Sequence, residues 1–237
     1  MHIRILETGA PPAPLDQEFS AYPAMFERLL APLGPALTFS ATAIHQGGPA
    51  PAIDEFDGLL ITGSAAGVYE GHDWIAPAED LVRRTADAGK PQVGICFGHQ
   101  LMAQALGGRV EKSDKGWGVG VHDYDIRDAT EWMDPAQGRI ACAVSHQDQV
   151  VAAPPGARIL GGSEFCPLAM LDYAQGPAIS FQPHPEFSAD YASALLRLRR
   201  GRIPAAVADP ALATLSGKSD RELLARWIVN FFQLNAR

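Results

Sequence analysis

The sequence has few cysteines, no long hydrophobic run and no excess of positive charge. Its three cysteines in 237 residues, Cys96, Cys142 and Cys166, have neither the spacing of a metal site nor the number of a disulfide framework, which indicates a reducing compartment. No apolar run approaches the length of a membrane span, and the N-terminus shows no signal-peptide core. The net charge of −8 argues against a nucleic-acid or anionic-membrane surface. These absences predict a cytoplasmic protein that binds neither nucleic acid nor a membrane.

The first half of the chain alternates strand and helix patterns. This alternation, over residues 1–108, predicts an α/β fold built on a doubly wound, mostly parallel sheet flanked by helices. Strands are expected at residues 2–8, 36–44, 57–62 and before Cys96, and helices at residues 22–30, 74–88 and from His99. Short strands follow, at residues 117–126, 139–145, 157–162, 168–173 and 178–182. They predict a smaller antiparallel β portion within a single domain, residues 1–237.

The stretch at residues 92–108 joins a buried-strand pattern to a helix pattern. An apolar run reaches Gly94, and apolar residues recur at helical spacing from His99 to a Gly-Gly pair. Cys96 therefore lies at a tight strand-to-helix turn, the geometry of a nucleophile elbow. A helix N-terminus favours thiolate, the reactive form of cysteine, and the Phe97 amide would point at an oxyanion. The alternative is a buried cysteine at an ordinary strand-to-helix turn.

A second candidate segment is Gln-Pro-His-Pro-Glu at residues 182–186. Pro185 favours an extended conformation at His184, and residues two apart in an extended segment share a face. Glu186 would then accept a hydrogen bond from the imidazole of His184, whose other nitrogen would face Cys96. A cysteine nucleophile needs such a base and a group that orients it. The alternative is a loop whose histidine and glutamate meet only solvent, and the coincidence with the elbow weighs against it.

The two segments together, Gly-Ile-Cys-Phe-Gly-His-Gln and the later Gln-Pro-His-Pro-Glu, resemble the class I (triad) glutamine amidotransferases, particularly the domain found in GMP synthase. The resemblance covers approximately residues 3–187 and implies a flavodoxin-like fold. It also implies that Cys96, His184 and Glu186 form a catalytic triad.

The same resemblance implies further site residues. The backbone amides of Gly63 and Phe97 would form the oxyanion hole, and Gln100 would contact the amino-acid end of the substrate. The segment Ser-His-Gln-Asp-Gln-Val resembles the family's Ser-His-Gly-Asp-x-Val, which helps bind the glutamine backbone; its first three residues are Ser145, His146 and Gln147. The alternative for His146 is a turn histidine that is hydrogen-bonded to the backbone.

Two positions depart from the family pattern. The loop after Thr62 lacks the usual Gly-Gly-Pro, which concerns the oxyanion-hole amides, and Gln147 stands where glycine is common, which concerns the width of the pocket. Both variants also resemble stand-alone members, including plant γ-glutamyl peptidases.

The site predicts a reaction class without a metal or organic cofactor. Cys96 would attack a γ-glutamyl carbonyl, His184 would protonate the departing amine, and water or another amine would resolve the thioester. Three functions stay open: a glutaminase subunit of a glutamine amidotransferase, a partner-independent γ-glutamyl peptidase or hydrolase, and a non-catalytic binding or regulatory protein. The sequence contains no glycine-rich phosphate loop, so we expect either a subunit that awaits a synthetase or a self-sufficient hydrolase. The complete set of cysteine, histidine and glutamate weighs against the third function.

Residues 188–237 form a C-terminal helical extension beyond the motifs. Helices are expected at residues 189–200 and 221–234, joined by a segment rich in proline and alanine at residues 203–219. Their apolar stripes predict burial against the sheet; the alternative is that a surface including Trp227 receives a synthetase or a second copy of the chain. A basic run suits the negative dipole end of the first helix; it comprises Arg197, Arg199, Arg200 and Arg202.

Overall fold

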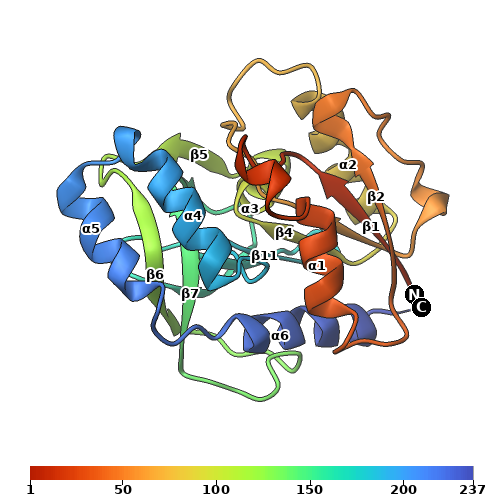
Figure 1. The fold of residues 1–237 in the computed structure, drawn as a ribbon. Helices are drawn as coiled ribbons and strands as arrows, with labels where there is room; N and C mark the ends of the chain where they lie inside the picture. Colours follow the sequence, from red (N-terminus) through yellow and green to blue (C-terminus); the bar gives the residue numbers. More distant parts are fainter. Residues whose placement is uncertain (237) are drawn as a thin grey trace.

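A nine-stranded mixed sheet forms the centre of the molecule in the computed structural model, which describes residues 1–236 (Figure 1). Its strand order is β2-β1-β3-β4-β11-β10-β9-β6-β7. These strands are β1 (His2–Glu7), β2 (Thr38–Ala43), β3 (Gly58–Ile61), β4 (Gln92–Ile95), β6 (Gly118–Ile126), β7 (Arg139–His146), β9 (Arg158–Gly162), β10 (Met170–Asp172) and β11 (Ala178–Phe181). A second, two-stranded antiparallel sheet pairs β5 (Arg109–Lys112) with β8 (Asp148–Ala152).

The strands from β2 to β11 pair in parallel, and those from β11 to β7 pair antiparallel. Every residue of β3, β4 and β11 is buried, as expected for parallel strands covered on both faces. In the register of these three strands, Gly94 lies between Ile61 and Ser180. The carboxyl ends of β3, β4 and β11 therefore meet at one edge of the sheet.

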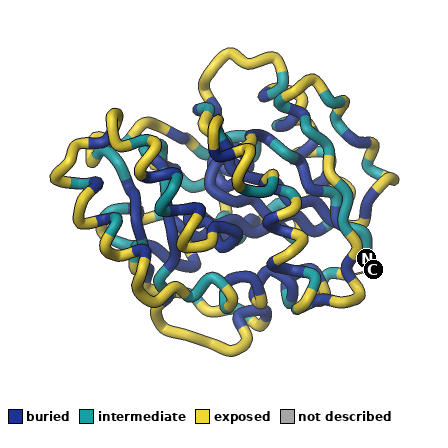
Figure 2. Tube along the Cα trace, in the orientation of Figure 1, coloured by how far each residue is buried: buried dark blue, intermediate teal, exposed yellow. Residues whose placement is uncertain are grey.

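Side chains alternate between the two faces of the parallel strands. Leu60 and Val93 pack on the face covered by α1 and α6, whereas Leu59 and Ile61 pack on the face covered by α2 and α3. These helices are α1 (Tyr22–Leu30), α2 (Ile75–Asp87), α3 (Phe97–Ala105) and α6 (Arg221–Leu234). Figure 2 shows the result, a buried sheet beneath helices that are exposed on their outer sides.

The helices α4 (Ala189–Arg199) and α5 (Ala205–Thr214) cover the antiparallel end of the sheet, beside β6 and β7 (Figure 1). Gly120 of β6 allows the close approach of α5. Its φ of 90° lies in the left-handed region, and a Cβ there would lie 2.6 Å from Thr214 Oγ1. The same Thr214 hydroxyl accepts a hydrogen bond from the Val121 amide at 2.8 Å. A side chain at Gly120 would therefore push α5 off the sheet.

The predicted fold class is confirmed, and the expected helices and strands lie within a few residues of their predicted ends. Two parts were missed. Residues 203–219 were expected only to join two helices but contain α5, in which Pro210 interrupts the helical pattern. The strands β5 and β8 were not expected: β5 is mostly exposed and lacks an apolar run, and β8 begins inside the Ser-His-Gln-Asp segment, which was interpreted as a binding motif.

Trp227 lies in the core. Its side chain is 0% exposed, packs edge-on against Trp132 at 6.4 Å between ring centroids, and donates a hydrogen bond from Nε1 to the Pro135 carbonyl at 3.1 Å. The hypothesis that Trp227 anchors a partner is therefore wrong, and the alternative that the stripe of α6 packs on the sheet holds.

The helices are short. The longest is α6, with 14 residues. Within residues 1–236, no helix has the length and apolar character needed to cross a membrane.

Candidate active site

Cys96 lies between the end of β4 and the start of α3. Its backbone angles are φ 53° and ψ −101°. Within residues 1–236 it is the only residue other than glycine with a positive φ. Such a backbone costs on the order of 1–3 kcal/mol and persists only where its surroundings hold it. Gly94 and Gly98 flank the turn. A Cβ on Gly94 would overlap the backbone of Gly98, and a Cβ on Gly98 would overlap the backbone of Ile61 at the end of β3. The two glycines therefore allow α3 to pack closely against β4 and β3 around Cys96.

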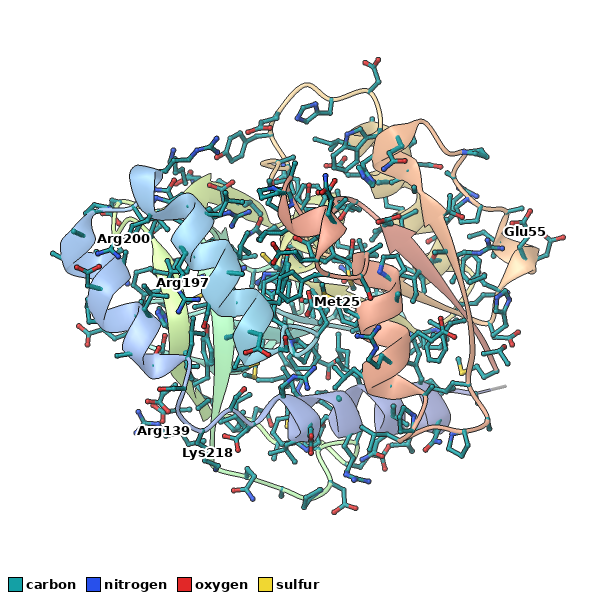
Figure 3. All side chains as sticks on the ribbon, in the orientation of Figure 1. Met25, Glu55, Arg139, Arg197, Arg200 and Lys218 are labelled. Atoms are coloured by element: carbon teal, nitrogen blue, oxygen red, sulfur yellow. The ribbon has the colours of Figure 1, made fainter. Side chains whose placement is uncertain are left out.

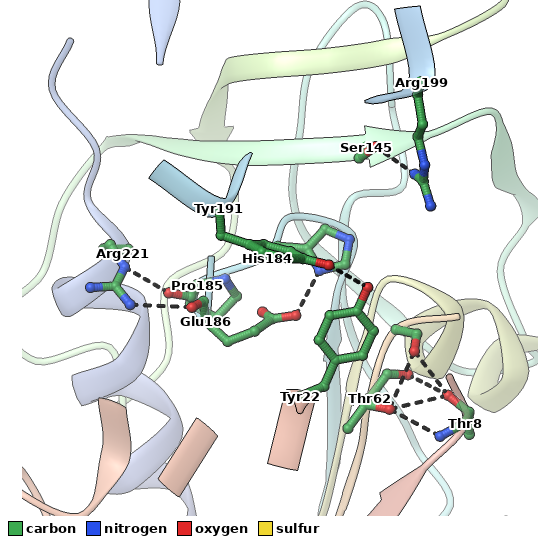
Figure 4. Close-up of polar contacts among 11 residues, drawn as sticks. Thr8, Tyr22, Thr62, Ser145, His184, Pro185, Glu186, Tyr191, Arg199 and Arg221 are labelled. Atoms are coloured by element: carbon green, nitrogen blue, oxygen red, sulfur yellow. Dashed lines mark hydrogen bonds and ion pairs between the residues drawn. The ribbon is translucent and has the colours of Figure 1, made fainter. Parts of the chain in front are cut away.

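His184 and Glu186 follow β11, the strand beside β4. His184 Nδ1 and Glu186 Oε1 form a hydrogen bond of 2.7 Å, and both side chains are buried (Figure 4). The two residues were expected to share one face of an extended segment, but they meet across a turn in which the Phe187 amide donates to the His184 carbonyl at 3.4 Å. The Phe187 ring stacks on the imidazole at 3.9 Å between centroids. The turn and the stack together fix the plane of the imidazole.

The charge of His184 is set by its two neighbours. Burial disfavours the protonated ring, but the negative charges of Cys96 and Glu186, and hydrogen bonds to both side chains, outweigh it and raise the pKa of His184 to about 10. The ring is therefore positively charged at neutral pH, and its Nδ1 proton is donated to the Glu186 carboxylate.

Gly63 lies beside Cys96 and His184, and Phe97 directly follows Cys96 in the chain. A Cβ on Gly63 would lie 2.8 Å from His184 Cε1 and 3.7 Å from Cys96 Cβ, so only glycine fits beside the histidine. Within residues 1–236, no hydrogen-bond acceptor is found for either amide. The loop that carries Gly63 is held by Thr8, whose hydroxyl donates to the Thr62 carbonyl at 2.9 Å (Figure 4).

Helix α6 supports the histidine segment from outside the sheet. The Arg221 guanidinium donates hydrogen bonds to the Pro185 carbonyl at 2.9 Å and to the Glu186 carbonyl at 3.3 Å (Figure 4). No motif singled out Arg221, because its partners are backbone atoms 36 and 35 residues earlier in the chain.

A pocket of about 170 Å³ opens at Cys96. The expected substrate-binding residues all line it, namely Gln100, Ser145, His146 and Gln147. Gln100 Nε2 donates to the Asp148 carbonyl at 2.9 Å and to Gln182 Oε1 at 3.1 Å. These two bonds fix the orientation of the Gln100 amide at the pocket wall.

His146 has features of both roles expected for it, a residue of the substrate pocket and a turn histidine bonded to the backbone. Its Nδ1 is hydrogen-bonded to the Asp148 carbonyl at 3.0 Å, as a turn histidine would be, yet the residue also lines the pocket. Burial lowers its pKa to about 3, so the ring is neutral. His99, on the buried side of α3, instead bonds Ser180 Oγ through Nδ1 at 2.7 Å and fastens the helix to β11.

Taken with this geometry, the comparison with protein families is decisive. The family model described as "Glutamine amidotransferase class-I" matches residues 34–197. The chain belongs to the class I glutamine amidotransferase family.

Relatives within the family include enzymes of two kinds. γ-Glutamyl peptidase 4 of Arabidopsis thaliana is 26% identical over 189 residues, which cover 76% of this chain and 75% of that protein. GMP synthase (glutamine-hydrolyzing) of Cupriavidus pinatubonensis is 36% identical over 137 residues, which cover 54% of this chain but 24% of that protein. A solved glutamine amidotransferase from Thermotoga maritima has the same fold, with a TM-score of 0.80 at 16% identity over 100% of this chain and 98% of that one.

Several pocket residues of this family member were missed by the sequence analysis. They are Tyr69 and Glu70 from the loop after β3, Lys112, Trp117, Arg199 at the end of α4 and Arg202 in the turn that follows it. The two arginines belong to the basic run that was assigned to the helix dipole. The sequence analysis therefore noted their charge but did not predict that they line the pocket. Arg199 and Arg202 also lie beyond residue 197, where the family match ends.

Within residues 1–236, no group of three or more histidine, cysteine, aspartate or glutamate side chains is arranged to hold a metal ion.

Proposed function

We propose that this protein is a cysteine-dependent hydrolase of γ-glutamyl amides. Cys96 is the nucleophile, His184 the general acid and base, and Glu186 the group that orients His184. The observation that carries this proposal is the position of Cys96: its strained backbone presents the sulfur at the start of α3, next to a histidine that Glu186 holds at 2.7 Å.

The reaction begins with attack of the Cys96 sulfur on the γ-carbonyl carbon of the substrate. The Gly63 and Phe97 amides stabilise the negative oxygen that forms, because both are free to donate there. The protonated His184 then gives its proton to the departing nitrogen, the C–N bond breaks, and a γ-glutamyl thioester remains on Cys96. His184 next takes a proton from water, the resulting hydroxide attacks the thioester, and glutamate and the free cysteine are released.

The pocket residues identified above bind the γ-glutamyl head in this proposal. A head with an ammonium and a carboxylate needs polar partners away from the nucleophile, and the walls on either side of Cys96 supply them. These residues are Gln100, Ser145, His146 and Gln147.

Two versions of this function differ in the leaving group. A partner-independent γ-glutamyl peptidase or hydrolase is supported by the peptidase relative, which this chain matches over three quarters of both lengths. A glutaminase subunit that passes ammonia to a synthetase partner is supported by the GMP synthase relative, of which the chain covers only 24%.

A substrate panel without any partner protein tests the proposal. Glutamine, a γ-glutamyl peptide and a γ-glutamyl alkylamine are incubated with the wild-type chain and with Cys96→Ala, and free glutamate is measured. We expect glutamate release by wild type and none above background by Cys96→Ala. A self-sufficient hydrolase turns over at least one compound rapidly, whereas a subunit that needs a synthetase hydrolyses glutamine slowly and is labelled at Cys96 by a diazo-ketone analogue of glutamine.

A third result would overturn the proposal. If the wild-type chain neither releases glutamate nor becomes labelled, yet binds γ-glutamyl compounds, the non-catalytic binding protein is the correct description.

A further inference from the structure

Arg199 is a half-buried cation in the pocket without a carboxylate partner in the described part of the chain. Its Nη1 donates to Ser145 Oγ at 2.7 Å (Figure 4), and no acidic side chain of residues 1–236 lies within ion-pair distance. The next residue, Arg200, pairs with Asp209 instead. Figure 3 shows Arg197 and Arg200, its neighbours in sequence, at this end of α4.

The acidic side chains of the pocket already have other partners. Glu70 pairs with His72 at 2.9 Å, and Asp148 accepts a hydrogen bond from the Tyr69 hydroxyl at 3.0 Å. Lys112 lies near Asp148 and lowers the pKa of that carboxyl, although burial raises it more. Arg199 and Arg202 are therefore the cations of the pocket that remain for a ligand.

A guanidinium in this position favours an anion. It presents five N–H donors, of which the Ser145 hydroxyl uses one, and partial burial weakens the hydration of the others. Burying a charge without a partner is costly, and the planar donor pair of arginine matches the two oxygens of a carboxylate.

We propose that Arg199, with Arg202 beside it, binds a carboxylate of the substrate. This inference rests on the proposed function and names the part of the substrate that the two arginines recognise, a carboxylate within reach of α4. Two groups could supply it, the α-carboxylate of the γ-glutamyl head or a carboxylate on the departing amine, as in a γ-glutamyl amino acid. Since both arginines lie beyond the segment that the family model matches, this contact is a feature of the C-terminal extension.

Three compounds separate the two sources. γ-Glutamylglycine has both carboxylates, N5-methylglutamine (γ-glutamylmethylamide) lacks the one on the leaving group, and 4-aminobutanoylglycine lacks the one on the head. We expect Arg199→Leu to lower kcat/KM for γ-glutamylglycine by about 10- to 100-fold, the range of a charge-assisted hydrogen bond. The penalty should fall below about twofold for the compound that lacks the bound carboxylate, which identifies the source.

Arg199→Lys and Arg197→Leu are the matched variants. The lysine keeps the charge but loses the paired donors, so its penalty should be intermediate. Arg197 is exposed and lies on the same helix outside the pocket, so Arg197→Leu should behave as wild type. Equal effects of Arg199→Leu on all three compounds would overturn the inference.

Binding to the Cys96→Ala background keeps this test separate from the proposed function. Calorimetry with the same three compounds measures the Arg199 penalty without turnover. If wild type hydrolyses γ-glutamyl compounds but the penalty is independent of the carboxylates, only the carboxylate inference fails. If no compound is hydrolysed but the binding penalty follows one carboxylate, only the hydrolase proposal fails.

Discussion

The parallel half of the sheet and the C-terminal helices contribute to the same site in different ways. The parallel strands β3, β4 and β11 deliver Gly63, Cys96 and His184 from three adjacent strand ends. Helices α4 and α6 approach from outside and deliver Arg199 and Arg221, long side chains that reach the pocket and the histidine turn.

The strand ends therefore carry the reacting groups, whereas the helices carry residues that alter the rate or the choice of substrate. Reacting groups at the ends of β3, β4 and β11 are fixed by the backbone of fully buried strands, so their geometry changes little with the surface around them. Long basic side chains on peripheral helices can be replaced without changing the sheet. We therefore expect substitutions in the first region to abolish the reaction and substitutions in the second to alter its rate or its substrates.

The largest effect is expected at Cys96. Cys96→Ala removes the nucleophile and should lower kcat by at least about 10⁴-fold, because the residual rate then depends on binding and oxyanion contacts alone. A diazo-ketone analogue of glutamine should label Cys96 and spare Cys142 and Cys166, since burial raises the pKa of both other thiols to about 12. Peptide mass spectrometry locates the label. Full activity in Cys96→Ser, or a label on another cysteine, would show that the nucleophile is not at the end of β4 and would contradict the comparison of the two regions.

His184 and Glu186 should differ from each other. His184→Ala removes the proton carrier and should abolish turnover, whereas Glu186→Gln keeps a hydrogen-bonding side chain and should lower kcat by roughly 10- to 10⁴-fold. Because the charge of Glu186 helps to raise the pKa of His184, Glu186→Gln should lower that pKa and move the alkaline limb of the rate profile to lower pH. Equal losses in the two variants, with an unmoved limb, would contradict an orienting role for Glu186.

Trp227 tests how much the burial of α6 contributes to the stability of the fold. Trp227→Ala leaves a cavity in the core and should lower the free energy of unfolding by about 3–5 kcal/mol, measured by denaturant titration. The matched control is Leu234→Ala on the same helix, where the side chain is 50% exposed and a change within about 0.5 kcal/mol is expected. A Trp227→Ala variant as stable as wild type would contradict the role of Trp227 in the core.

The smallest effect is expected at Arg221, a positioning residue. Arg221→Ala frees the carbonyls of Pro185 and Glu186 and should lower kcat by about 10-fold with little change in KM, because the histidine turn loosens while the pocket does not change. Arg221→Lys should recover part of the loss. Arg226→Ala, an exposed arginine on the same helix, is the control. A change in KM alone would contradict the positioning role and would assign Arg221 to substrate binding.

The sequence predicted the parallel half well because its signals are local. The elbow at Cys96 and the Gln-Pro-His-Pro-Glu segment each occupy a few consecutive residues, and the resemblance to a family joined them. The turn between His184 and Glu186 was not predicted, because a proline before or after a residue limits its backbone without deciding between an extended and a turned chain.

The contributions of the C-terminal helices could not be predicted from the same kind of signal. Arg199 and Arg221 act on groups 54 and 36 residues away in the chain, and an arginine at a helix end satisfies the helix dipole equally well wherever its side chain points. Helix α5 was missed because it contains Pro210 within its ten residues. In the sequence analysis this proline argued against a helix more strongly than the alanines argued for one.

The backbone of Cys96 also has a consequence for how the site is assembled during folding. A residue other than glycine leaves the left-handed region as soon as its surroundings permit, and here those surroundings are the close contacts of Gly94 and Gly98 between β4 and α3. A chain in which α3 has not yet docked therefore lacks the elbow, and its thiol is separated from both His184 and the helix terminus. The nucleophile is assembled only with the folded core, so the loss of Cys96 labelling by the diazo-ketone analogue as denaturant is added reports where this strand–helix junction opens.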